Sequence, residues 1–187
     1  MKKVLGLCFI KLKNFANNCI NARNRDFFFT RKSSVHHSFK LGSGNFLDIS
    51  PDSEFQFGKN VFINQNNFIT IKPNAKLSIG EGTYITRAII SCLGEIEIGE
   101  NCILGEGMKI FDHNHQYTKQ PFSVSKTDFN IGKVKLGNNV WTGANVTILK
   151  DVTIGNNVIL GAGCVIYKDV PSDSIIINKQ DQQLISL

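Results

Sequence analysis

Hydrophobic and polar positions repeat with a period of six residues along the C-terminal part of the chain. Residues 136–171 divide without a gap into six hexads: LGNNVW, TGANVT, ILKDVT, IGNNVI, LGAGCV and IYKDVP. Five of the six first positions are branched aliphatic residues, and every fifth position is small and apolar. A helix face repeats at about 3.6 residues and a strand at 2, so a period of six fits neither. The pattern predicts short units that stack on copies of themselves, as in a parallel β-helix.

Less regular hexads extend the pattern upstream to about residue 46, with slips of register near residues 73 and 93. The rhythm stops after Ile110 and resumes at residue 136. A long interruption of a solenoid is usually functional. We therefore predict a basic N-terminal segment over 1–45, a hexapeptide-repeat domain over 46–171 with an extruded loop at 111–135, and a C-terminal cap over 172–187.

The basic charge is concentrated at the N-terminus. Residues 1–45 carry nine Lys or Arg against one Asp, whereas the remainder carries twelve basic and fourteen acidic side chains. Residues 1–25 place Leu and Phe at helical spacing with lysines between them. This segment is expected either to pack on the end of the solenoid or to contact an anionic membrane surface. No nucleic-acid-binding motif accompanies the basic run, so no nucleic-acid partner is expected.

The five cysteines show no CxxC spacing, and two of them, Cys102 and Cys164, occupy the small fifth position of hexads. A thiol at such a position behaves as a small hydrophobic group. We therefore expect reduced, structural cysteines and a cytosolic protein. The apolar content of 42% and the charged content of 19% are those of an ordinary folded protein.

The candidate chemistry lies where the hexads are interrupted, in the segment FDHNHQY. In extended chain, His113 and His115 face the same way, with Asp112 before them. These side chains can be read as polar residues at the base of a loop, as two ligands of a metal site that lacks a third, or as a general base held by its neighbours. The residues alone leave these alternatives open.

The hexads, the DHNH at the end of one of them, the long interruption and the restart NNVWTGANVTI together resemble the hexapeptide-repeat acyltransferases, over about residues 55–171. Within that family the chain is most similar to the O-acetyltransferases of sugars and surface polysaccharides. The resemblance implies a left-handed β-helix of triangular section with about 18 residues per coil. It also implies a homotrimer with active sites between subunits, acetyl-CoA as co-substrate and no metal.

The resemblance also implies roles for individual residues. His115 matches the general base of the family, with His113 and Asp112 beside the acceptor, and Trp141 matches the wall of the acceptor and acetyl pocket. Four small residues match the backbone along which the thioester and the pantetheine arm lie, and a lysine matches a contact of the CoA phosphates: Gly143, Ala144, Gly161, Ala162 and Lys168. The Ala144 N–H would stabilise the oxyanion.

Two features depart from the family pattern. The family has VWIG where this chain has VWTG, so Thr142 occupies the first position of a hexad, which is normally aliphatic. The tail also lacks the Gly-x-Pro-Ala segment of the family. The expected reaction is direct transfer of acetyl from acetyl-CoA to a sugar hydroxyl. The alternatives are N-acetylation of an amino sugar, a metal-dependent hydratase of the carbonic anhydrase kind, and a scaffold without catalysis.

Overall fold

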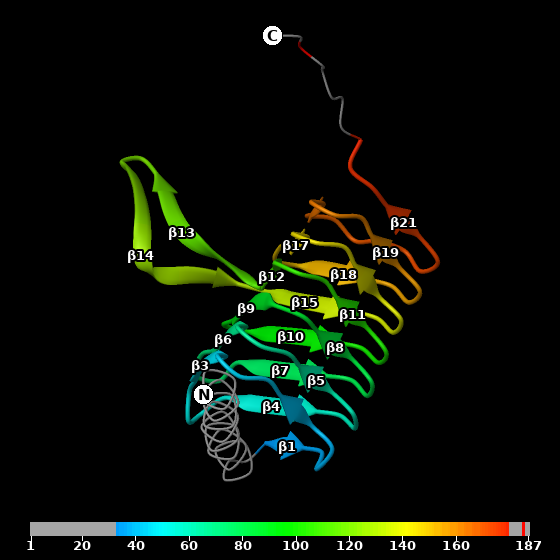
Figure 1. Cartoon of the computed structure of the whole chain (residues 1–187). Helices are drawn as coiled ribbons and strands as arrows, with labels where there is room; N and C mark the ends of the chain where they lie inside the picture. The colour runs from blue at the N-terminus through cyan, green and yellow to red at the C-terminus, as the bar shows by residue number, and fades with distance from the viewer. Residues whose placement is uncertain (1–32, 180–184, 186–187) are drawn as a thin grey trace, which may run out of the picture.

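In the computed structural model, which describes residues 33–179 and 185, the chain winds into a triangular stack of coils built from three parallel sheets (Figure 1). Sheet 1 contains β1 (Ser34–Val35), β4 (Glu54–Phe57), β7 (Lys76–Ile79), β10 (Glu95–Ile98), β15 (Lys133–Leu136) and β18 (Val152–Ile154). Sheet 2 contains β2 (Lys40–Leu41), β5 (Phe62–Ile63), β8 (Tyr84–Ile85), β11 (Ile103–Leu104), β16 (Trp141–Thr142), β19 (Ile159–Leu160) and β21 (Ile175–Ile176). Sheet 3 contains β3 (Phe46–Ile49), β6 (Phe68–Ile71), β9 (Ala88–Cys92), β12 (Met108–Phe111), β17 (Thr147–Ile148) and β20 (Val165–Ile166).

The left-handed parallel β-helix expected from the hexads is confirmed. Both apolar positions of each hexad are buried: the first positions Leu136, Thr142, Ile148, Ile154, Leu160 and Ile166, and the fifth positions Val140, Val146, Val152, Val158, Cys164 and Val170. Leu136 pairs with Ile154, which lies 18 positions later in the chain. One coil therefore consists of three hexads, and each hexad supplies one side of the triangle.

The corners of the triangle require backbone that most residues avoid. Where sheet 2 turns into sheet 3, Gly107 and Asn145 stack on each other with φ of 72° and 57°. Where sheet 1 turns into sheet 2, Asn139 donates to Asn157 at 2.9 Å and Asn157 donates to Asp173 at 2.8 Å. Asn, Asp and Gly tolerate left-handed φ, and the side-chain ladders link successive coils. This explains the Gly and Asn that recur within the hexads.

The interruption is a β-hairpin rather than a loop, which corrects the prediction for residues 111–135. Strands β13 (His113–Lys119) and β14 (Phe122–Ile131) pair antiparallel and project from the stack (Figure 1). Ile110 pairs with Ile148, 38 positions later, so this turn of the solenoid carries 20 residues more than a regular coil. The hairpin leaves where sheet 3 turns into sheet 1.

The ends of the solenoid differ from the expected boundaries. β1 and β2 pair with β4 and β5, so the coils begin at Ser34 and not at residue 46. At the other end, β21 adds to sheet 2 beside β19, within the expected cap. The helix predicted over residues 1–25 lies outside the described residues. The described part of the chain contains no helix of the length and apolarity that crossing a membrane requires.

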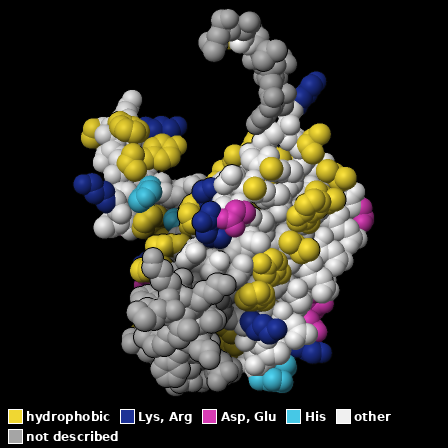
Figure 2. Space-filling model, viewed as in Figure 1, with side chains coloured by type: hydrophobic (Ala, Val, Ile, Leu, Met, Phe, Trp, Pro, Cys, Tyr) yellow, Lys and Arg dark blue, Asp and Glu magenta, His cyan; other side chains and the backbone are white. Residues whose placement is uncertain are grey.

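The outer faces of the sheets differ in character. Sheet 1 carries ion pairs between neighbouring coils, including Lys76 with Glu54 at 3.2 Å and Lys135 with Glu97 at 2.8 Å. Sheet 2 carries a ladder of mainly apolar side chains in register: Phe62, Tyr84, Ile103, Trp141, Ile159 and Ile175. Figure 2 shows hydrophobic side chains as a stripe along the stack of coils and again over the hairpin.

Candidate active site at the base of the hairpin

Asp112 is the first residue after β12, and its side chain turns into the protein, where it is fully buried. Its carboxylate accepts hydrogen bonds from the backbone N–H groups of Leu93 (2.9 Å) and Gly94 (2.7 Å) in the preceding coil. A side chain at Gly94 would collide with the carbonyl oxygen of Gly132 at 2.7 Å. A buried carboxylate is stable only when its oxygens are paired. Asp112 thus anchors the point at which the hairpin leaves the coil.

His113 is a further hydrogen-bond partner of the Asp112 carboxylate. Its Nδ1 lies 2.9 Å from Asp112 Oδ1, and its side chain is 14% exposed. Since a carboxylate only accepts hydrogen bonds, Nδ1 carries the proton and Nε2 is left able to accept one. The ring also contacts Phe111 and Phe129 edge-on. The sequence therefore places a histidine beside an acidic residue that fixes its tautomer and orientation.

His115, the base expected from the family resemblance, lies farther along β13 and is exposed. Its Nδ1 is 2.9 Å from the backbone carbonyl of Ser125 on β14, and its ring lies 4.6 Å from that of Phe129. Its tautomer is fixed as well, but by a neutral acceptor within the hairpin. Both histidines thus have an oriented ring, and only His113 is paired with a carboxylate and largely covered.

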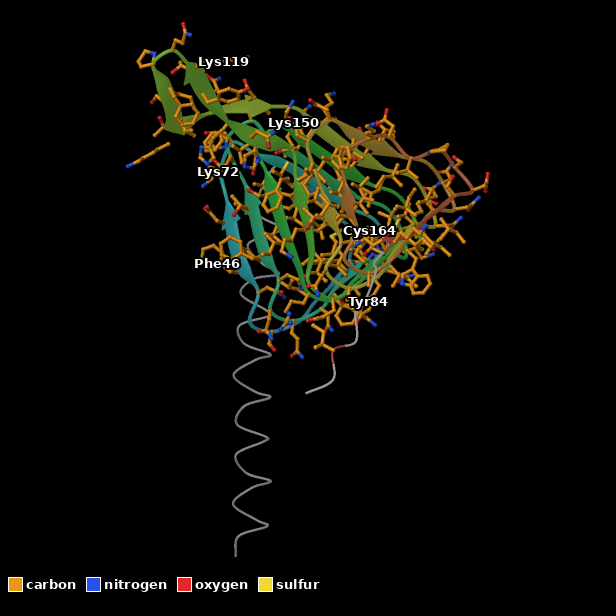
Figure 3. The ribbon with its side chains drawn as sticks, turned by 90° about the horizontal axis from the view of Figure 1, so that it is seen from above. Phe46, Lys72, Tyr84, Lys119, Lys150 and Cys164 are labelled. Carbon is orange, nitrogen blue, oxygen red and sulfur yellow. The ribbon has the colours of Figure 1, made fainter. Side chains whose placement is uncertain are left out.

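A cleft of about 460 Å³ opens beside His113, within the roughly 300–1,000 Å³ typical of small-molecule sites. Sheet 3 and the hairpin of the same chain line it with Thr70, Lys72, Pro73, Ser91, Leu93, His113, Phe129 and Ile131. Figure 3 shows Lys72 at the edge of the coils near the hairpin, which carries Lys119. Sequence reasoning missed Thr70, Ser91 and Phe129, because no motif marks them and only the fold brings them to His113.

The small residues predicted to hold the thioester lie at the other edge of sheet 3, where sheet 2 turns into sheet 3. Gly143 and Gly161 stack in successive coils, and a Cβ on Gly143 would lie 2.6 Å from the backbone nitrogen of Ala162. The Gly143 N–H donates to Leu160. Ala144 is exposed, and among the described residues no acceptor is recorded for its N–H. The Ala144 N–H can therefore donate a hydrogen bond to an oxygen of a bound ligand.

Trp141 lies on the outer face of sheet 2, between Ile103 and Ile159, and 52% of it is exposed. Thr142 next to it occupies the first position of its hexad and is fully buried. Its hydroxyl accepts a hydrogen bond from the Gly105 N–H at 2.9 Å. The hydroxyl therefore takes the place that a backbone carbonyl has at the equivalent point of the other coils. This hydrogen bond accounts for a threonine at a hexad position that is aliphatic in the other five hexads.

The structure does not bring all the predicted residues together in one chain. His113 follows β12 at one edge of sheet 3, and Ala144 precedes β17 at the opposite edge. The four residues of β12 alone span about 13 Å at about 3.3 Å per residue. Lys168 lies beyond β20 on the His113 side, with its Nζ 5.8 Å from the ring centre of Tyr167. Asp112 and His113 are thus together, whereas Trp141, Gly143, Ala144, Gly161 and Ala162 form a separate group.

The cysteines of the described part of the chain are buried. Cys92 is buried below the Asp112 carboxylate, and burial together with that negative charge raises the pKa of its thiol, which stays protonated. The predicted structural cysteines, Cys102 and Cys164, are buried, as expected. Within residues 33–179 and 185, no three His, Cys, Asp or Glu side chains are grouped to hold a metal ion.

Comparisons with known proteins agree with this architecture. The family model described as the bacterial transferase hexapeptide (six repeats) matches residues 133–168. A maltose O-acetyltransferase from Clostridium difficile 630 is 26% identical with a TM-score of 0.51, over 76% of this chain and 63% of that one. This chain therefore spans less than two thirds of the Clostridium protein. No curated protein sequence matches the chain.

Two further solved structures share the fold. The polysialic acid O-acetyltransferase OatWY is 22% identical with a TM-score of 0.51, over 80% of this chain and 95% of that one. A hexapeptide transferase family protein from Anaplasma phagocytophilum is 18% identical with a TM-score of 0.52, over 76% and 72% of the two chains. The chain thus contains hexapeptide repeats and has the fold of these transferases, as its motifs indicated.

Proposed function

We propose that this protein is an acetyltransferase that moves the acetyl group of acetyl-CoA to a hydroxyl of a sugar, in a surface polysaccharide or its precursor. The observation that carries the proposal is the pair of Asp112 and His113, whose Nε2 is left able to accept a proton beside a cleft. The repeat match and the 26% identity to a maltose O-acetyltransferase support the choice of reaction.

His113 is proposed as the general base, in place of His115. Its Nε2 takes the proton of the sugar hydroxyl, while Asp112 stabilises the imidazolium that forms. The sugar oxygen attacks the thioester carbon, and the Ala144 N–H donates to the oxyanion of the tetrahedral intermediate. The C–S bond then breaks, the acetyl ester remains on the sugar, and the imidazolium returns its proton to the CoA thiolate. No covalent acyl-enzyme is needed.

Because the base and the Ala144 amide lie at opposite edges of sheet 3, we propose that each site forms between two chains of a cyclic trimer. Such symmetry presents one edge of every chain to the other edge of a neighbour and gives three equal sites. The apolar ladder on sheet 2 is the proposed contact, since Ile103 is 51% exposed in the single chain. Ile103→Glu should give monomers in light scattering, and Thr153→Glu on the outer face of sheet 1 should not.

The proposed function is tested with purified full-length protein and acetyl-CoA. Thermal unfolding should move to higher temperature with CoA, because a ligand of the folded state stabilises it. Maltose and related sugars should accelerate release of free thiol from acetyl-CoA, and mass spectrometry should show the sugar ester. Absence of both the thermal shift and the thiol release in trimeric protein would contradict the proposal.

A further inference from the structure

We propose that the cleft at the base of the hairpin binds the acceptor as an uncharged sugar ring held by hydroxyl-to-hydroxyl hydrogen bonds. This inference rests on the proposed function and specifies its substrate class. The cleft lies between sheet 3 and the hairpin of one chain, so the acceptor site does not itself require a second subunit.

The first support is a buried hydroxyl that faces the cleft. Thr70 lies between two core residues of β6, Ile69 and Ile71, so its side chain points outward. It is nevertheless only 7% exposed, and no hydrogen bond to its hydroxyl is recorded among the described residues. A buried hydroxyl without a partner is unfavourable, and one that lines a cleft is suited to pair with a ligand.

A second hydroxyl lies beside the first. Ser91 on β9 is the direct neighbour of Thr70 in the parallel ladder, and it also lines the cleft. Neighbouring strands are about 4.8 Å apart. Two hydroxyls at that spacing can serve adjacent hydroxyls of one sugar ring, each donating one hydrogen bond and accepting another.

The opposite wall is aromatic. Phe129 on β14 lies 5.2 Å from the His113 ring and lines the cleft together with Ile131 of the same strand. A pyranose presents C–H groups on one face, which pack on apolar side chains, and hydroxyls at its rim. An apolar wall with a few placed polar groups is the usual construction of a small-molecule site.

The charges argue for an uncharged ring. Apart from His113, Lys72 is the one ionisable side chain among the described residues that line the cleft, and its Nζ is paired with Asp48 at 2.8 Å. Asp112 is fully buried, with its oxygens occupied by backbone amides and His113. Among the residues that line the cleft, an ammonium group would therefore find no unpaired carboxylate and a carboxylate no unpaired lysine, which also favours O-acetylation over N-acetylation.

The experiment measures acetyl transfer to four methyl glycosides: the glucoside and the galactoside, which are neutral, the glucuronide, which is anionic, and the glucosaminide, which is cationic. At least one neutral glycoside should have the highest kcat/KM. Thr70→Val and Ser91→Ala should each raise its KM by about 5- to 10-fold, as expected for one lost hydrogen bond, with the KM of acetyl-CoA unchanged. Thr153→Val, on the outer face of sheet 1, is the matched control.

Saturation-transfer NMR with the same neutral glycoside, in the presence of CoA, separates this inference from the proposed function. Binding that weakens in Thr70→Val without any acetyl transfer would support the sugar site and contradict the transferase. Transfer whose acceptor KM is unchanged in both variants would overturn the sugar site and leave the transferase standing. A preference for the glucuronide or the glucosaminide would overturn the uncharged ring. Thermal unfolding verifies that each variant is folded.

Discussion

The two edges of sheet 3 present different groups, and the proposed reaction uses both. At the edge toward sheet 1, a buried carboxylate orients His113 beside a cleft. At the edge toward sheet 2, small residues stack so closely that backbone lies where a side chain would be, and the Ala144 amide is exposed. In the proposed function, the first edge holds the proton acceptor and the second admits a narrow ligand along the backbone. The comparison is the ground for the proposal that each chain supplies two half-sites, which neighbouring chains of a trimer would combine.

The largest expected effect comes from removing the base. His113→Ala should lower kcat by at least about 100-fold, because the sugar hydroxyl then has no group to accept its proton. His115→Ala is the matched control, since it removes the same side chain two residues away on the same strand. His115→Ala should lower kcat by less than about 10-fold. If His115→Ala proves the more damaging variant, the base is His115, as the family resemblance predicted, and the pair of His113 with Asp112 is structural.

The second prediction tests whether the His113 edge of one chain and the Ala144 edge of another form one site. Ala144→Leu should block the narrow ligand without altering the histidine, so it should be as inactive as His113→Ala. Trimers assembled from equal amounts of the two inactive chains should recover about a quarter of the wild-type activity, because about one site in four pairs an intact base with an intact amide. Refolding each variant alone is the control. Mixed trimers without recovery would show that both halves of a site belong to one chain.

The core of the fold was predictable because its information is local. Every first and fifth position of the hexads from Leu136 to Val170 is buried as predicted, since each coil repeats the same contacts. The pairing of His113 with Asp112, which favours His113 over His115 as the proposed base, was not predictable. It depends on Asp112 turning inward to amides 18 and 19 residues earlier in the chain, a contact that no hexad register encodes. Thr70 and Phe129 likewise meet only through the coil and the hairpin.

A third, smaller effect tests what orients the base. Asp112→Asn keeps an oxygen for the amides of Leu93 and Gly94 but presents an N–H₂ group to His113. The histidine must then accept at Nδ1 and carry its proton on Nε2, which is the wrong tautomer for a base. We expect kcat to fall by at least about 10-fold with the acceptor KM nearly unchanged. A parallel loss of CoA-dependent thermal stabilisation would instead indicate collapse of the corner.

The smallest effect is expected on the outer face of sheet 1. Glu95 forms an ion pair with Lys133, and the hydrogen bond from this lysine lowers the pKa of the Glu95 carboxyl. A carboxyl whose pKa is lowered by folding contributes stability above its unfolded pKa and loses it as the pH falls through the folded value. Glu95→Gln should therefore flatten the loss of thermal stability between about pH 5 and pH 3.

At pH 7 the same variant should lower the melting temperature by no more than about 2 °C, because solvent-exposed ion pairs contribute little. Its kcat should equal that of the wild type, since the Glu95 side chain lies on the outer face of sheet 1 and does not line the cleft. High salt should reduce the difference in melting temperature further, because the pair is screened. A fall in kcat without a change in melting temperature would mean that sheet 1 takes part in the site. The two edges of sheet 3 would then not account for the whole of the proposed site.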